Sequence, residues 1–274
     1  MDLGVSGKAA AVTGGSKGIG YAIADRLAEE GADVAICARS EGELREAASE
    51  IAENHGVDCE PIPADLTDRS EAAAFIEETV DRLGGLDILV NNAGSAPGGK
   101  LENLSENDWY QALDLKLMGH VRCTTEAMPH LVESEGVVVN LIGNDGTKPS
   151  PGELTPGAAN AGGINFTEAV AKQYGREGVR ANAVNPGPVA TERWDYLVEV
   201  MAEEQGLTPE QAMEIAENSI PIGRICEPGE VANVVAFLAS EQASFVNGAV
   251  VEVDGAQEKA LLEFDTIRAA SENL

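Results

Sequence analysis

Residues 8–20 read KAAAVTGGSKGIG, and this stretch decides the fold. The run KAAAVT predicts a β-strand, and a helical pattern begins at residue 18, directly after the glycines. Glycines at a strand-to-helix turn allow a tight bend and let a phosphate approach the N–H groups at the positive end of the helix. The spacing Gly14-x-x-x-Gly18-x-Gly20 differs from the plain G-x-G-x-x-G pattern, so on its own the loop also fits an ordinary glycine-rich turn.

Short apolar runs alternate with longer helical patterns along the rest of the chain. Strands are predicted at 8–13, 33–38, 58–63, 86–91, 136–142, 179–185 and 248–253, and helices at 18–30, 41–54, 68–83, 105–133, about 158–175 and 228–240. This alternation is typical of βαβ units, whose strands are covered by helices on both faces. The sequence therefore predicts a single-domain α/β fold with a Rossmann-type, doubly wound, seven-stranded parallel sheet.

Two segments depart from this alternation. Residues 191–222 form a predicted helical insertion between the sixth and seventh strands, and they carry Trp194 and Tyr196. An insertion after the carboxyl end of a strand lies over the ligand crevice, so we expect a substrate lid. The domain, lid included, then spans residues 1–256, and residues 257–274 are a C-terminal helical extension. Its apolar face would consist of Leu261, Leu262, Phe264 and Ile267.

The chain is strongly acidic. Its 274 residues include 47 Asp plus Glu against 18 Lys plus Arg, for a formal net charge of −29. Phosphate-rich partners are repelled by such a charge, which argues against nucleic-acid binding and against docking on an anionic membrane. The acidic residues are spread along the whole chain, a pattern that resembles proteins of salt-adapted archaea. A solvated acidic surface screened by molar salt explains it better than a basic partner does.

Targeting and metal signals are weak. The chain shows neither an 18-residue apolar stretch nor a signal-peptide pattern, so we expect a cytoplasmic protein. Cys37, Cys59, Cys123 and Cys226 are far apart and form no C-x-x-C pair, which favours reduced core thiols. The three histidines, His55, His120 and His130, have no metal-ligand spacing, and we predict no metal site.

Further motifs follow the other strands: Asp65 in ADLTD, NNAG at 91–94, and NPGPVATE at 185–192. From about residue 5 to residue 256, their order and spacing resemble the short-chain dehydrogenase/reductase family. The resemblance implies an NAD(P)-binding domain in which Asp65 contacts adenine and residues of NPGPVATE hold the nicotinamide amide. The expected cofactor-binding residues are Gly14, Ser16, Lys17, Gly18, Ile19, Gly20, Arg39, Ser40, Asp65, Leu66, Asn92, Ala93, Gly94, Pro186, Gly187, Val189 and Thr191.

The end of the second strand selects the cofactor. An NAD site needs a carboxylate there to accept hydrogen bonds from the ribose 2′-OH, but this position holds Ala38, followed by Arg39. Lys17 lies inside the glycine loop. Two cations near the ribose suit a 2′-phosphate, so we expect NADP(H) to be favoured over NAD(H). The alternative is that both residues are ordinary surface charges.

The resemblance fails where the chemistry takes place. Family enzymes use Asn, Ser, Tyr and Lys, and alignment places Lys116, Gly143, Pro156 and Asn160 at these four positions. No tyrosine of this chain has a lysine four residues later. Lysine at the Asn position and asparagine at the Lys position would preserve a pair with exchanged roles, so we name Lys116 and Asn160 as catalytic candidates. The alternative for Lys116 is an ordinary helix lysine that reaches solvent or Asp114.

Glu153 lies just ahead of the tyrosine position. We expect an exposed loop carboxylate, and the alternative is a proton donor whose pKa is raised by desolvation. The resulting hypothesis is an NADP(H)-dependent oxidoreductase that acts on a small carbonyl or alcohol by a non-standard proton path. The competing hypothesis is a catalytically silent NADP-binding protein with a regulatory or structural role. The family resemblance implies a homo-oligomer, a tetramer, built through helices 105–133 and 158–175.

Overall fold

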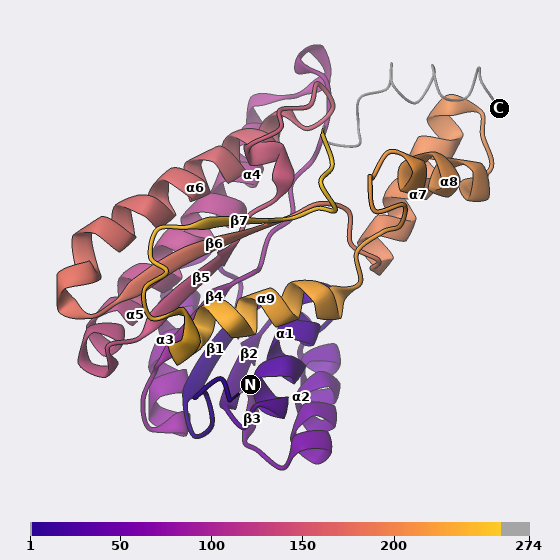
Figure 1. The fold of residues 1–274 in the computed structure, drawn as a ribbon. Coiled ribbons are helices and arrows are strands. Elements are labelled where there is room, and N and C mark those ends of the chain that lie inside the picture. The colour runs from indigo at the N-terminus through magenta and orange to yellow at the C-terminus, as the bar shows by residue number, and fades with distance from the viewer. Residues whose placement is uncertain (1, 259–274) are drawn as a thin grey trace.

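Seven parallel strands form one sheet in the order β3-β2-β1-β4-β5-β6-β7 (Figure 1). The structure is a computed structural model, and it describes residues 2–258. The strands are β1 (Ala9–Thr13), β2 (Asp33–Cys37), β3 (Cys59–Pro61), β4 (Ile88–Asn91), β5 (Val137–Leu141), β6 (Arg180–Pro186) and β7 (Val250–Val253). The predicted single-domain fold with a seven-stranded parallel sheet is confirmed.

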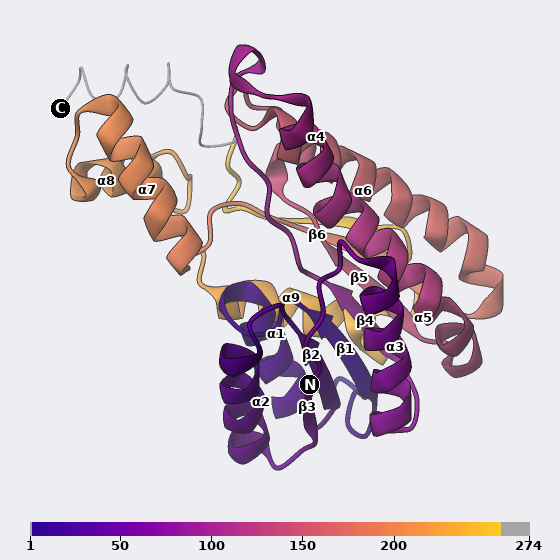
Figure 2. The same ribbon diagram turned by 180° about the vertical axis from the view of Figure 1, so that it is seen from behind.

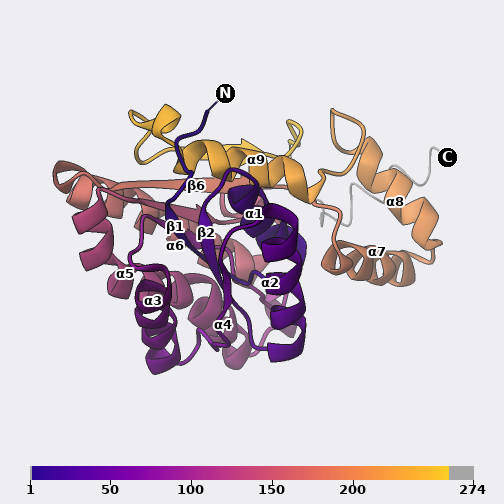
Figure 3. The same ribbon diagram turned by 90° about the horizontal axis from the view of Figure 1, so that it is seen from below.

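Helices cover both faces of this sheet. Figure 3 shows α1 (Gly18–Glu29) and α9 (Pro228–Ala239) on one side of the strands, and α3 (Arg69–Leu83) and α5 (His120–Ser134) on the other. On the first side, α2 (Glu41–His55) adds to a core that includes Leu27 and Val235. On the second, α6 (Leu154–Tyr174) completes a core that includes Phe75 and Leu131. Every residue of β1 and β5 is buried, as expected for a strand covered on both faces.

The order of the strands indicates where the ligand crevice lies. β1 pairs with β2 on one side and with β4 on the other, so the chain builds the sheet outward in two directions from this point. In doubly wound sheets, ligands bind outside the carboxyl ends of the strands at such a switch point. The glycine loop follows β1 and the NNAG motif ends β4, which brings both motifs to the crevice.

Two helices differ from their predicted bounds by more than single terminal residues. The helix predicted at 105–133 consists of α4 (Glu106–Leu113), a π-helical turn at Asp114–Gly119, and α5. Single π turns inside helices are rare and occur often at functional sites, and this one carries Lys116. The helix predicted from about residue 158 begins at Leu154, because Pro156 falls in its first turn, where a missing N–H costs no intrahelical bond.

The segment after β6 projects from the layers. It contains α7 (Glu192–Gln205) and α8 (Pro209–Asn218), which stand away from the sheet in Figures 1 and 2. Trp194, Met201 and Ile215 belong to a small core of its own. A backbone hydrogen bond of 2.8 Å from Ala190 N–H to the Cys226 carbonyl joins its two ends. Of the predicted C-terminal extension, residues 259–274 lie outside the described residues.

The remaining composition-based expectations concern membranes, thiols and metals. Within residues 2–258, no helix is long and apolar enough to cross a membrane. All four cysteines are free thiols; Cys37 and Cys123 are buried, whereas Cys59 and Cys226 are half-buried. In the same range, His, Cys, Asp and Glu side chains form no group of three or more that is placed to hold a metal ion.

Candidate active site

The glycine loop is shaped by close contacts that exclude a side chain. A Cβ atom on Gly20 would lie 2.1 Å from the Gly14 carbonyl oxygen and 2.5 Å from Asn92 Nδ2. Gly14 and Gly18 have φ values of +68° and +59°, a region that favours glycine. The loop can therefore pass close under the first turn of α1, whose free N–H groups and positive dipole suit a phosphate.

Asn92 fixes the loop against β4. Its backbone N–H donates to Thr13 Oγ1 over 2.8 Å, and its side-chain Nδ2 donates to the Thr13 carbonyl over 2.9 Å. The Ala93 N–H donates to the same Thr13 hydroxyl over 2.9 Å. The two motifs at the switch point thus form one rigid unit.

A cleft of about 930 Å³ opens along this unit. All the predicted cofactor-binding residues border it except Gly187 and Val189, which border a smaller adjoining pocket. The volume and the loop of free N–H groups fit a dinucleotide. The structure therefore gathers residues from five separate strand ends, those of β1, β2, β3, β4 and β6, as the motif order predicts.

One end of the cleft carries the expected cations. Lys17 Nζ lies 3.0 Å from Glu192 Oε2 of α7, and this hydrogen bond raises the pKa of the lysine. Asp65 accepts hydrogen bonds from the Thr67 N–H and hydroxyl, which lower the pKa of its carboxyl, and the charge of Arg39 lowers it further. Both cations are exposed on the rim, where a phosphate can reach them.

The adjoining pocket, of about 230 Å³, is lined by polar side chains from four elements. They are Lys116 from the π turn, Asp145 from the turn after β5, Glu153 and Asn160 from the start of α6, and Arg193 from α7.

Asn160 is buried, and its Nδ2 donates to Asp145 Oδ1 over 2.5 Å. A Cβ atom on Gly143 would lie only 2.6 Å from the same Nδ2, so the asparagine amide fills the space beside this glycine.

Lys116 lies against the end of the NNAG motif. A Cβ atom on Gly94 would be 3.2 Å from Lys116 Cγ and 3.5 Å from Nζ, so a side chain at position 94 would crowd the lysine. Burial lowers the pKa of Lys116, while the carboxylates of Asp145 and Glu153 oppose this effect. The lysine thus turns into the site and does not pair with Asp114, whose carboxylate binds Arg122 at 2.5 Å.

The expectation that Glu153 is an exposed loop carboxylate is wrong. Its side chain is half-buried, and burial together with the charge of Asp145 raises the pKa of its carboxyl to about 7. The cause is tertiary: the segment after β4 forms a bridge between Gly99 and Glu153, and this bridge holds the carboxyl against Gly98.

A family sequence model described as enoyl-(acyl carrier protein) reductase matches residues 14–256. A 3-oxoacyl-(acyl-carrier-protein) reductase of Staphylococcus aureus is 36% identical over 249 residues, covering 90% of this chain and 97% of that protein. The corresponding reductase of Thermotoga maritima is 34% identical and covers 92% and 98%. The chain belongs to the short-chain dehydrogenase/reductase family. Like these two reductases, it is a short-chain oxidoreductase.

Solved structures agree with this assignment. L-sorbose reductase from Gluconobacter frateurii, in complex with NADPH and L-sorbose, superposes with a TM-score of 0.90 at 30% identity, covering 95% of this chain and all of that one. A variant of actinorhodin polyketide ketoreductase with NADPH gives a TM-score of 0.88 at 32% identity, covering 92% and 97%.

The site of this short-chain oxidoreductase includes residues that sequence reasoning did not assign. Arg193 and His120 border the cleft, and Tyr196 of α7 lies over it with 64% of its surface exposed. Trp194 is instead buried in the core of the insertion, with its Nε1 3.4 Å from Met213 Sδ. The lid pattern at 191–222 was the available signal for Arg193 and Tyr196, but it did not show which side of α7 faces the cleft.

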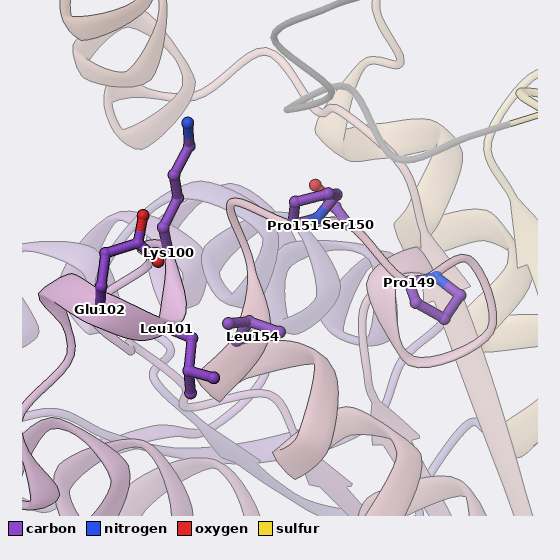
Figure 4. Close-up of a pocket in the computed structure, with 7 residues that line it drawn as sticks. All are labelled: Lys100, Leu101, Glu102, Pro149, Ser150, Pro151 and Leu154. Atoms are coloured by element: carbon purple, nitrogen blue, oxygen red, sulfur yellow. The ribbon is translucent and has the colours of Figure 1, made fainter.

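A separate hollow of about 590 Å³ lies outside the cleft (Figure 4). It forms where the turn at Leu101–Asn103 passes the loop before α6. Its lining consists of Lys100, Leu101, Glu102, Pro149, Ser150, Pro151 and Leu154. None of these residues lines the cleft or the polar pocket, so the hollow is not part of the site described above.

Proposed function

We propose that this short-chain oxidoreductase uses NADP(H) and interconverts a small carbonyl compound and its alcohol by a proton path without the family's tyrosine. The observation that carries the proposal is the polar pocket with Lys116, Asp145, Glu153 and Asn160, which adjoins the cofactor cleft. Two structural relatives crystallised with NADPH support the cofactor, and the ketose in one of them supports a carbonyl substrate.

The chain's own groups hold the reactants. The glycine loop and the start of α1 would bind the diphosphate, and Lys17 and Arg39 the 2′-phosphate. When bound, NADPH supplies the hydride that reduces the carbonyl carbon. The Lys116 ammonium stabilises the negative charge that develops on the substrate oxygen. Asn160 holds a water molecule between this ammonium and the substrate oxygen.

Coenzyme choice tests the cationic end of the cleft. Each charge-assisted contact to the phosphate contributes about 1.5–3 kcal/mol, or roughly 10- to 150-fold in affinity, so calorimetry should give a lower Kd for NADPH than for NADH. Arg39→Asp should reverse the preference, because the new carboxylate repels the phosphate and accepts from the ribose hydroxyl. Equal affinity of the unmodified protein for both coenzymes contradicts the assignment.

Measuring turnover distinguishes an active oxidoreductase from a catalytically silent NADP-binding protein. NADPH fluorescence is followed while the protein is mixed with a panel of small ketones, keto sugars and 3-oxoacyl thioesters. Consumption of NADPH with at least one of them supports the proposal. A fluorescence shift on binding, without consumption on any of them, favours the regulatory alternative.

Assembly and location complete the proposal. We propose a cytoplasmic homotetramer that acts on a small molecule and associates through α4, α5 and α6, the helices that correspond to the predicted 105–133 and 158–175. Light scattering should give the mass of four copies. Deletion of residues 257–274 without a change in that mass would show that the extension takes no part in the assembly.

A further inference from the structure

Glu153 occupies a place where the fold does not use its side chain. It is the N-cap residue of α6, but its carboxylate accepts no capping hydrogen bond from the helix. A Cβ atom on Gly98 would lie 3.2 Å from both Oε1 and Oε2, which places the carboxyl directly beside the loop after β4. Nearby, Thr155 Oγ1 donates to the Pro97 carbonyl, and the Gly99 N–H donates to Gly152 over 2.7 Å. The carboxyl is therefore held on the wall of the polar pocket by neighbouring backbone.

The charges around Glu153 come from three other elements. Asp145 precedes α6 in the turn after β5, Lys116 belongs to the π turn and Arg193 to α7, and all three line the same pocket. Asp145 Oδ1 accepts a hydrogen bond from the Asn160 amide. Burial disfavours the ionised form of Glu153, and the neighbouring negative charge of Asp145 adds to this effect. The two cations act in the opposite direction, and the pKa of the Glu153 carboxyl remains raised, to about 7.

Other groups near the pocket are poorer proton donors. The pKa of His120 is lowered to about 3 by burial and by the charge of Lys116, so its ring is neutral at physiological pH. Tyr196 lies over the larger cleft and does not line the polar pocket. Asp145 already accepts the hydrogen bond of Asn160. Among residues 2–258, Glu153 alone combines a position in this pocket with a carboxyl that exchanges its proton near neutral pH.

We propose that Glu153 is the catalytic acid and base of this enzyme, a role that rests on the proposed carbonyl reduction. During reduction, the carbonyl carbon accepts the hydride that the reduced cofactor supplies, and the substrate is thereby reduced as the cofactor is oxidised. The O–H bond of the Glu153 carboxyl breaks and a new O–H bond forms on the substrate oxygen, which leaves an alcohol and a Glu153 carboxylate. Water then returns a proton to the carboxylate, and oxidation of the alcohol runs through the same groups in reverse.

The central variant is Glu153→Gln, which keeps the size of the side chain and removes its titration. We expect kcat to fall about 100-fold or more, with the Kd for NADPH and the thermal midpoint preserved at pH 6. Glu153→Asp restores a carboxyl on a shorter arm and should recover part of kcat. The matched control is Glu102→Gln, which removes an exposed carboxylate from the neighbouring turn and should leave kcat unchanged.

Two readouts distinguish a proton donor from a structural residue. In the wild type, kcat/KM for reduction should fall as pH rises through about 7, whereas oxidation should rise through the same range; Glu153→Gln should lose both inflections. In protein labelled with ¹³C at the glutamate carboxyl, one NMR resonance should titrate near pH 7 and should be missing from Glu153→Gln but present in Glu102→Gln.

The results test two claims separately: the role of Glu153 and the proposed oxidoreductase activity. A wild type that reduces carbonyl compounds, paired with a Glu153→Gln variant of unchanged kcat and pH profile, overturns the role of Glu153 and leaves the oxidoreductase intact. Absence of the resonance that titrates near pH 7 overturns that role as well. A wild type that turns over no compound of the panel contradicts the proposed function, and the role of Glu153 with it.

Discussion

The partly desolvated ammonium of Lys116 lies beside Gly94 of the NNAG motif, and Lys116 borders both the cleft and the polar pocket. Lys116→Met keeps most of the side-chain length and removes the charge, so the negative charge on the substrate oxygen loses its stabilisation. We expect kcat to fall about 100- to 1,000-fold, with NADPH affinity nearly unchanged, as measured by steady-state kinetics and calorimetry. Lys172→Met is the control, because this exposed lysine of α6 pairs with Glu168 and lines neither the cleft nor the polar pocket. Normal turnover in Lys116→Met would rule out the exchanged Lys/Asn pair.

The raised pKa of Glu153 also has a consequence for stability. Its folded-state pKa of about 7 lies above the ordinary value of 4.5, so between these values the folded protein binds more protons than the unfolded chain. The free energy of unfolding therefore falls as pH rises from about 4.5 to about 7. Glu153→Gln does not ionise, so its thermal midpoint relative to the wild type should be higher at pH 8 than at pH 5. Calorimetry at constant salt checks this, and a pH-independent difference would speak against a buried carboxyl.

At this scale, the sequence predicted which residues border the cleft better than it predicted the surroundings of Glu153. Gly14, Asn92 and Thr191 stand in contiguous motifs at strand ends, and topology alone carries strand ends to the crevice. Glu153 gains its environment from the bridge with Gly99, a contact between two distant loops. Burial of this kind is a tertiary property that no local pattern encodes, so an exposed loop was the natural expectation. The exchanged roles of Lys116 and Asn160 stay a prediction.

Among the elements, the glycine loop offers a direct test of packing. Gly20→Ala would place a methyl group 2.1 Å from the Gly14 carbonyl oxygen, a backbone atom that cannot move aside without deforming the loop. We expect a loss of about 1–3 kcal/mol in the free energy of unfolding, and NADPH binding at least tenfold weaker. Gly42→Ala on α2 is the control, because nothing lies within 4 Å of its added Cβ and alanine favours a helix. Similar Kd values for both variants would show that the loop accommodates the methyl group.

The hydrophobic pattern of the sequence predicts the presence of strands and helices better than it predicts where helices begin or change their winding. All seven predicted strands correspond to strands of the sheet. The buried inner strands read as continuous apolar runs, whereas the edge strands β3 and β7 are only partly buried. The π turn at Asp114–Gly119 was hidden, since one extra residue in a turn hardly disturbs the apolar spacing of a long helix. The early start of α6 was missed because Pro156 resembles a helix breaker unless its first-turn position is known.

The whole molecule carries more negative charge than its cations can pair. Arg82 bridges Glu60 and Glu78, and Arg26 reaches Glu29, but these pairs are partly exposed and each contributes little. With 47 acidic and 18 basic side chains, one-to-one pairing would leave 29 carboxylates without a cation. Salt therefore weakens a few attractions and many repulsions, so its net effect should be stabilising.

Molar salt gives the test at this scale. The Debye length falls from about 10 Å at 0.1 M to about 3 Å at 1 M, which is shorter than most distances between surface carboxylates. The thermal midpoint should therefore rise markedly between 0.1 M and 3 M KCl, measured at constant pH and protein concentration. Sucrose of equal osmolality serves as the control, because it stabilises by exclusion from the protein surface without screening charge. If KCl raises the midpoint no more than sucrose does, screening is not the cause; equal midpoints at both salt concentrations would refute salt adaptation of this acidic surface.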